Sequence, residues 1–158
     1  MKHLTLIVLT VTAVFLVACS SIDCPIETKV VVNYSVPDTL RYDTLTITTR
    51  KANGTDSVLQ NRLVGRVAFS LPVSYSQPAD TLVFHIADTL GLTTTDTVWM
   101  QKLNIPHFES IDCAAHFFHH ITDVQYTRRG IDTLFILNPT VNYDTKVNHL
   151  QIHFKSRY

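Results

Sequence analysis

The chain has 158 residues, with 13 Lys and Arg against 13 Asp and Glu, so its formal charge is zero at pH 7. This balance lacks the excess of basic residues expected of a protein that binds nucleic acid or anionic lipid. No nucleic-acid partner is therefore predicted. Hydrophobic residues make up 46 % of the sequence and charged residues 16 %, which excludes a largely disordered chain.

The first 18 residues have the pattern of a secretory signal peptide. Lys2 and His3 precede an apolar run, Leu4–Ala18, that is too short to span a bilayer as a mature helix. The sequence Leu16-Val17-Ala18-Cys19 resembles the lipobox of bacterial lipoproteins, in which the cysteine becomes the lipidated first residue after cleavage. The resemblance implies a palmitate-type lipid anchor on Cys19. An uncleaved anchor helix and an ordinary secretory signal, with Cys19 incidental, are the open alternatives.

The residue after Cys19 bears on the location. Ser20 does not resemble the aspartate that retains lipoproteins in the inner membrane of some bacteria. We therefore expect a lipid-anchored protein of the cell envelope, at the outer membrane, on either its periplasmic or its surface face. Residues 19–24 would form the lipidated N-terminus and a short tether, because only four residues separate Cys19 from Cys24.

The remaining cysteines, Cys24 and Cys113, are an expected disulfide pair. Outside the cytoplasm an unpaired thiol is poorly tolerated, and each of the two follows the tripeptide Ser-Ile-Asp. A loop of about 90 residues closed in this way would gain roughly 4–5 kcal/mol by chain entropy. Two unpaired cysteines that merely pack are the alternative.

Short alternating segments follow one another through residues 25–158, which we expect to form a single domain. Proline, glycine or asparagine separates them, which indicates separate strands and no long helix. The expected strands are 30–36, 44–49, 66–71, 82–87, 98–100 and 149–154. Asp123–Thr127 and Ile131–Leu137 are predicted to form a hairpin in which Gly130 is left-handed. The pattern predicts an all-β antiparallel sandwich, immunoglobulin-like, with a small β-barrel as the alternative.

The tripeptide Asp-Thr-Leu or a close relative recurs at irregular spacing. One interpretation is strand entry, because Asp favours turns while Thr and Leu begin a pleat. The other is modification, because Asp-Ser/Thr-apolar resembles an O-glycosylation acceptor motif of exported proteins in some gut anaerobes. The candidate acceptors are Thr39, Thr44, Ser57, Thr81, Thr89, Thr97 and Thr133.

The histidines are the candidate metal ligands. His149 and His153 lie four apart on one expected strand, roughly 13 Å between them, which is too far to share an ion. His116, His119 and His120 lie in a stretch whose flanks look extended. We therefore expect surface or half-buried histidines and no metal. The aspartates are scattered singly, with no EF-hand loop, so the sequence gives only a weak calcium signal.

Catalytic motifs are not recognisable. The sequence has no Gly-x-Ser-x-Gly elbow, no His-Glu-x-x-His and no phosphate-cradling glycine loop, so we expect no enzyme and no cofactor. Five aromatic residues could supply a stacking surface for sugar, although such residues more commonly pack in a core. They are Tyr42, Tyr75, Trp99, Tyr126 and Tyr143.

Three C-terminal segments, Phe108–Cys113, Ile131–Asn142 and His149–Phe154, resemble a family of small uncharacterised lipoproteins of the gut-anaerobe type. Its members begin with a lipobox and a second early cysteine and end in a hairpin reading Ile-Asp-x-x-x-Ile-x-Asn-Pro. The family has no assigned activity. We therefore expect a non-enzymatic lipoprotein that acts as an accessory or interaction module with a protein partner in the envelope. The alternative is a lipoprotein that binds a small ligand, a glycan or calcium.

Overall fold

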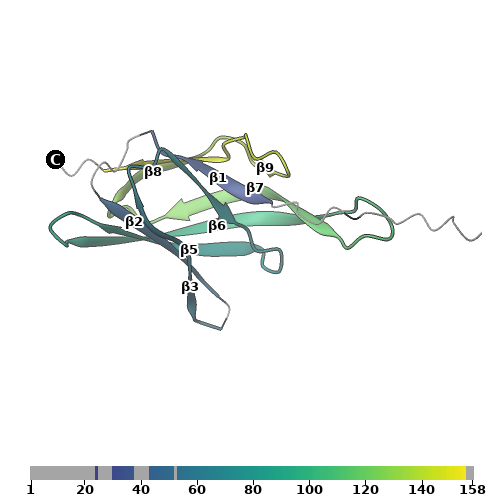
Figure 1. Ribbon diagram of the computed structural model, residues 1–158, viewed down its shortest axis with the longest axis horizontal. Helices are drawn as coiled ribbons and strands as arrows, with labels where there is room; N and C mark the ends of the chain where they lie inside the picture. Colours follow the sequence, from purple (N-terminus) through teal and green to yellow (C-terminus); the bar gives the residue numbers. More distant parts are fainter. Residues whose placement is uncertain (1–23, 25–29, 38–42, 52, 156–158) are drawn as a thin grey trace, which may run out of the picture.

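The computed structural model describes residues 24, 30–37, 43–51 and 53–155 of the chain. The regular elements in these ranges are all strands, and Figure 1 shows them in two packed sheets. The four-stranded sheet has the order β4-β1-β10-β8 and the six-stranded sheet the order β3-β2-β5-β6-β7-β9. The all-β sandwich is therefore confirmed. Its strands are β1 Val31–Ser35, β2 Thr44–Arg50, β3 Asp56–Val64, β4 Ala68–Pro72, β5 Ala79–Ala87, β6 Thr93–His107, β7 His116–Tyr126, β8 Ile131–Ile136, β9 Thr140–Val141 and β10 Leu150–Phe154.

The expected signal peptide 1–18, the lipidation residue Cys19, Thr39 and Tyr42 lie outside the described residues. Among the residues that are described, no helix has the length and hydrophobicity needed to cross a membrane.

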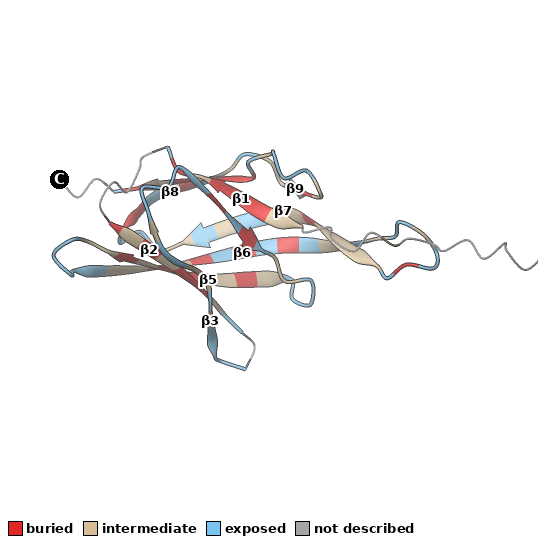
Figure 2. Ribbon diagram, viewed as in Figure 1, coloured by how far each residue is buried: buried red, intermediate tan, exposed pale blue. Residues whose placement is uncertain are grey.

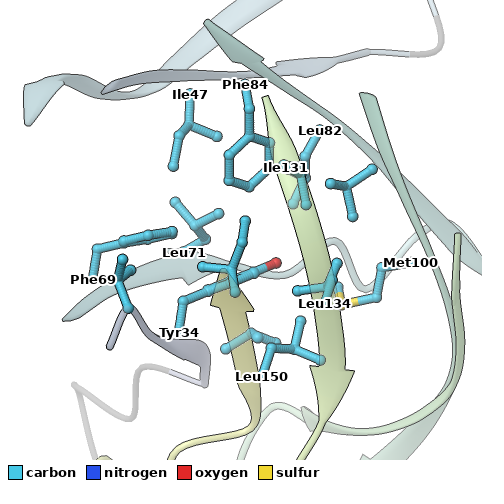
Figure 3. Close-up of a cluster of buried hydrophobic side chains, with 14 of the residues drawn as sticks. Tyr34, Ile47, Phe69, Leu71, Leu82, Phe84, Met100, Ile131, Leu134 and Leu150 are labelled. Carbon is cyan, nitrogen blue, oxygen red and sulfur yellow. The ribbon is translucent and has the colours of Figure 1, made fainter. Parts of the chain in front are cut away.

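The core lies between the two sheets and follows the alternation of each strand. Figure 2 shows buried positions alternating with exposed ones along β6. Tyr34 on β1 stacks on Phe69 of β4 with ring centroids 4.8 Å apart, and both rings tilt against Phe84 of β5 at 6.4 Å. These three rings join the sheets, and aliphatic side chains such as Leu71, Leu82, Met100 and Leu134 surround them (Figure 3).

β6 and β7 form a hairpin that continues well past the rest of its sheet. The β5–β6 ladder ends where Ala79 pairs with Gln101, whereas the β6–β7 ladder continues to His107 and His116. We call residues 102–121 the β6–β7 arm. The sequence predicts only 98–100 of β6 as strand, because Lys102 and Asn104 interrupt the apolar alternation and Pro106 cannot donate to a ladder.

The predicted hairpin between residues 123–127 and 131–137 is wrong. Both segments are strands, but β8 pairs with β10, while β7 pairs with β6 and β9, so the turn carries the chain from one sheet to the other. Gly130 does not have a positive φ. It is required for space, because a Cβ there would lie 2.7 Å from Cδ1 of the buried Ile86.

β3 is an edge strand that the sequence pattern does not reveal. It pairs only with β2, and its outward residues are largely solvent-exposed, so its apolar alternation is weak. The ladder is irregular near Ile47, and Arg62 has a φ of 51°. An irregular, twisted edge is a common protection against pairing with another chain.

Candidate functional site

A buried ion pair lies at the base of the β6–β7 arm. Lys102 continues the inward-facing row of Val98 and Met100 and is turned into the protein. Its Nζ lies 3.1 Å from Oδ2 of Asp80, and the Lys102 side chain is completely shielded from solvent. Burial raises the pKa of Asp80 although Lys102 opposes the shift, so desolvation outweighs the ion pair at this carboxylate.

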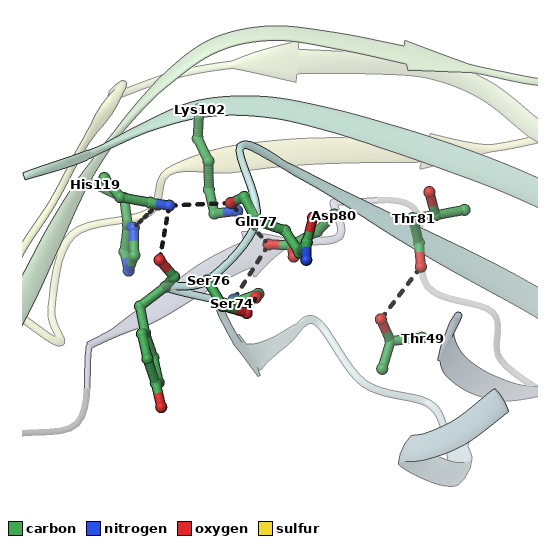
Figure 4. Close-up of polar contacts among 10 residues, drawn as sticks. Thr49, Ser74, Ser76, Gln77, Asp80, Thr81, Lys102 and His119 are labelled. Carbon is green, nitrogen blue, oxygen red and sulfur yellow. Dashed lines mark hydrogen bonds and ion pairs between the residues drawn. The ribbon is translucent and has the colours of Figure 1, made fainter. Parts of the chain in front are cut away.

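The ion pair holds the loop between β4 and β5, residues 74–78, which we call the 74–78 loop. The side-chain Nζ of Lys102 donates to the carbonyl of Gln77 at 2.7 Å, and the backbone N–H of Lys102 donates to the carbonyl of Pro78 at 2.9 Å. The backbone N–H of Ser74 donates to Asp80 Oδ2 at 3.3 Å. Both ends of the loop are thus fixed by one pair of buried charges (Figure 4).

Asn104 fixes the middle of the same loop and orients a buried histidine. Its Nδ2 donates to the carbonyls of Tyr75 and Gln77 at 2.9 and 3.0 Å. Because both amide hydrogens are used in this way, Oδ1 of Asn104 is an acceptor and receives the Nδ1–H of His119 at 2.8 Å. The geometry therefore assigns the proton of neutral His119 to Nδ1 and leaves a lone pair on Nε2.

His119 is only 2 % exposed, on the inner face of the arm beside Asn104. Burial, with a smaller effect of the nearby Lys102 charge, lowers the pKa of His119 to about 4. The ring is therefore neutral at physiological pH, and its Nε2 is a hydrogen-bond acceptor. The expectation that this histidine is on the surface or half-buried is wrong, because Asn104 and the 74–78 loop cover it.

A cleft of about 420 Å³ opens beside the 74–78 loop and reaches His119. We call it the aromatic cleft, because Tyr75 stacks on Phe117 along its wall with ring centroids 5.4 Å apart and nearly parallel. Its volume falls in the usual range for small-ligand sites. Among the residues that the structure describes, the cleft is lined by Val30, Val73, Tyr75, Ala115, His116, Phe117 and His119.

A second cleft, of about 380 Å³, lies on the other side of the 74–78 loop and is polar. Hydroxyl groups, two cationic side chains and the edge of Asp80 form its wall, and Thr49 Oγ1 donates to the carbonyl of Thr81 at 3.2 Å within it. Arg50 in this wall is paired with Asp56 at 3.1 Å. The 74–78 loop therefore separates an aromatic cleft from a polar one, and the buried charges keep it in place.

The outer face of the arm carries its own aromatic group. His107 stacks on Phe118 at 4.3 Å, and Tyr143 meets both rings edge-on. His116 also contacts Tyr143, and His120 lies on the same strand. Across the described ranges, no three His, Cys, Asp or Glu side chains are close enough to hold a metal ion.

His149 is also completely buried, contrary to the expectation for histidines. Its Nδ1 accepts the backbone N–H of Asn33 at 3.0 Å, and the backbone N–H of His149 donates to the Asn33 carbonyl at 2.9 Å. Burial lowers the pKa of His149. His149 thus holds the loop before β10 against β1, whereas His153, inside β10, is half-buried.

The four described aromatic residues considered for sugar stacking do not form one surface. Tyr75 lines the aromatic cleft, Trp99 lies on the outer face of β6, and Tyr143 belongs to the outer group of the arm. Tyr126 packs against the core with the Arg128 guanidinium 5.9 Å from its ring centre.

The candidate glycosylation residues differ in accessibility. Thr89 is exposed in the turn between β5 and β6, where Asp88 accepts the N–H groups of Leu90 and Leu92. The others that are described are half-buried: Thr44, Ser57, Thr81, Thr97 and Thr133. The strand-entry interpretation fits Asp43 and Asp56, which directly precede or begin a strand, but not Asp96, which lies inside β6.

The Cys24–Cys113 disulfide is confirmed. It joins the beginning of the described chain to the loop at the end of the β6–β7 arm, with the two Cα atoms 5.6 Å apart. The two cysteines are separated by 89 positions in the sequence.

Residues 44–154, which run from β2 to the end of β10, match a family described as "Family of unknown function (DUF6452)". The chain belongs to this family. Searches of curated proteins and of solved structures each found no match. The expectation of an uncharacterised family is therefore confirmed. In this DUF6452 member the matched region contains the Asp80–Lys102 pair, His119, Cys113 and the strand residues that line the two clefts. Cys24 and β1 lie before the matched region.

Sequence reasoning missed the centre of this site, Asp80, Lys102 and Asn104. A signal was present, because Lys102 occupies the inward position two residues after Met100 in an apolar alternation. A lysine at an inward position means either that the assumed strand register is wrong or that the lysine is a buried charge that needs a partner. The carbonyl groups that Lys102 and Asn104 bind belong to a distant loop and have no sequence signature.

Proposed function

We propose that this protein is a non-enzymatic lipoprotein, anchored through Cys19 at the outer membrane, that acts as an accessory or interaction module of the cell envelope. Its lipobox-like sequence, early second cysteine and Ile131–Asn142 segment are similar to those of the small lipoproteins described above. The observation that carries the proposal is the Cys24–Cys113 disulfide, because such a bond suits an exported protein.

An apolar row on the outer face of β6 supports the interaction role. Trp99, Leu103 and Ile105 are all solvent-exposed on one face of one strand. Exposed apolar side chains that cluster in this way are typical of contact surfaces. We therefore expect this apolar row to bind a protein partner in the envelope.

The anchor and the partner are tested separately. The full chain should fractionate with membranes and resist extraction by high salt, whereas Cys19→Ser should not. A photo-crosslinking residue at Leu103 should then give one reproducible adduct in intact cells, and the same residue at Asn61 on the exposed edge strand β3 should not. Membrane association that is unchanged in Cys19→Ser, or identical adducts from both positions, would contradict the proposal.

A second candidate function is the binding of a small glycan, favoured by one specific observation. The aromatic cleft is lined both by the exposed ring of Tyr75 and by His119, whose Nδ1–H bond to Asn104 leaves Nε2 as an acceptor. An aromatic face for C–H groups and a fixed acceptor for a hydroxyl are the two features that sugar recognition needs.

A thermal-shift panel of mono- and disaccharides tests this second candidate. A ligand that binds only the native state raises the free energy of unfolding by about 2.7 kcal/mol at a hundredfold excess over Kd. The shift should disappear in Tyr75→Ala and persist in Trp99→Ala, whose ring lies outside the cleft. A panel without any shift, or a shift that survives Tyr75→Ala, would remove the glycan function.

A further inference from the structure

The loop at the end of the β6–β7 arm, residues 108–115, carries exposed apolar side chains at one end of the molecule. Phe108 is 62 % exposed and Ile111 is 97 % exposed. We call these two residues and the loop between them the arm tip. Figure 1 shows this loop at one end of the long axis, with the β5–β6 turn, residues 88–92, at the other.

The disulfide fixes the arm tip relative to the proposed anchor. Cys113 is in the same loop as Ile111, and its Cα lies 5.6 Å from that of Cys24. Only four residues, Ser20–Asp23, separate Cys24 from Cys19. Even a fully extended chain of that length spans no more than roughly 18 Å. A lipid on Cys19 therefore keeps the arm tip within a short distance of the bilayer surface.

The side chains of the arm tip suit a lipid interface. Aromatic and aliphatic residues beside an anchor gain free energy by leaving water for the boundary between headgroups and acyl chains. The charged groups nearby are acidic: Glu109, which lies 3.1 Å from Nε2 of His107, and the exposed Asp112. These carboxylates disfavour an anionic surface, so the chemistry fits zwitterionic lipid.

We propose that Phe108 and Ile111 enter the interfacial region of the bilayer and act with the Cys19 lipid as a second point of attachment. This inference rests on the proposed anchor. Two attachment points orient the protein, so that the arm stands on the membrane and the 88–92 turn is farthest from it. The aromatic cleft, which is lined by Ala115 and Phe117 of the same arm, then opens close to the membrane surface.

Tryptophan fluorescence of the lipidated full chain in phosphatidylcholine vesicles tests the proposal. In a Trp99→Phe background, which removes the single native tryptophan, one variant carries Ile111→Trp and a matched control carries Leu90→Trp. Leu90 is 80 % exposed, is apolar like Ile111, and lies at the opposite end of β6. Both substitutions point into solvent, so neither disturbs the core.

The emission of Ile111→Trp should shift to the blue on vesicle binding, and shallow doxyl-labelled lipid should quench it at least twofold more than it quenches Leu90→Trp. Vesicle-bound protein in which the two tryptophans are quenched equally would overturn the arm-tip contact while leaving the anchor intact. Protein that does not float with the vesicles at all would overturn the anchor, and the arm-tip contact with it.

Discussion

The carboxylate of Asp96 accepts the backbone N–H of Gly130 at 2.6 Å, in the turn that carries the chain from the six-stranded sheet to the four-stranded one. The same carboxylate accepts the N–H groups of Arg129 and Ile131 and the hydroxyl of Thr127, at 2.6–2.8 Å. One buried acid of β6 therefore shapes the crossing between the sheets.

Replacing Asp96 by Asn should strongly destabilise the protein. An amide has one acceptor oxygen and would place an N–H group against backbone donors, so we expect a loss of about 2–4 kcal/mol in the free energy of unfolding. Burial alone would raise the pKa of Asp96, but these hydrogen bonds outweigh it and lower the pKa, so the stabilisation is present at neutral pH and is lost in acid. Urea unfolding at pH 7 measures the loss. The exposed Asp132→Asn is the control, and an equal effect of both variants would contradict this role.

Gly130→Ala should be destabilising because of one methyl group on Ile86. The new Cβ would lie 2.7 Å from Ile86 Cδ1, and Ile86 is buried, so we expect a loss of about 1–3 kcal/mol. Ile86→Val removes that Cδ1 and on its own costs about 0.5–1.5 kcal/mol. The double variant should therefore be more stable than the sum of the two losses predicts. Strict additivity in urea unfolding would show that the overlap is not the cause.

The Asp80–Lys102 pair should show strong coupling in a double-mutant cycle. Asp80→Asn or Lys102→Met alone leaves one buried charge uncompensated, which costs about 3–5 kcal/mol. The double variant Asp80→Asn/Lys102→Met should recover on the order of 1–3 kcal/mol of the summed losses. The exposed Arg50–Asp56 pair, at the same 3.1 Å separation, is the control and should show little coupling. Similar coupling in both pairs would contradict the importance of burial.

His119 should make the protein less stable in mild acid. Its pKa is about 4 in the folded protein and about 6.5 in an unfolded chain, so the unfolded state binds more protons between these values. The stability that neutral His119 provides is complete above pH 6.5 and is lost as the pH falls toward 4, by at most about 3 kcal/mol. His149 acts in the same direction and Asp80, whose pKa burial raises, in the opposite one.

Unfolding free energies from pH 7.5 to pH 4.5 measure this effect against His119→Asn. An asparagine amide can still donate to Asn104 Oδ1 but does not titrate. The variant should therefore have a shallower pH dependence than the native chain, while His149 and Asp80 are unchanged. Parallel curves would mean that His119 is not the group that titrates.

The sequence predicts the two-sheet architecture because alternation and turn residues are local signals. β1, β2, β4, β5 and β10 appear close to their observed bounds, since each has apolar residues at every second position and a proline or a turn beside it. The sequence also identifies Cys24 and Cys113, because an exported chain favours pairing. The length of β6 and the partners of Lys102 could not be predicted in this way, because they depend on a hydrogen-bonded loop far away in the chain.

The error at residues 123–137 has the same origin. Two strands beside a short turn with glycine usually pair, but here the turn is bound by Asp96 and packed against Ile86, and the second strand joins the other sheet. Both residues are more than 30 positions away, with Asp96 separated from Gly130 by 34 residues. Local patterns therefore identify the strands, whereas long-range contacts decide which strands pair.

The central claim is that a lipid on Cys19 and the Cys24–Cys113 disulfide together hold the β6–β7 arm at the membrane. A non-reducing tryptic digest of protein purified from membranes, followed by mass spectrometry, tests it most directly. Cleavage after Lys29, Lys102 and Arg128 should yield residues 19–29 joined to residues 103–128, with the mass of both peptides, a disulfide and a lipidated N-terminal cysteine. A mature chain that begins at another residue, or an unmodified Cys19, would contradict the account.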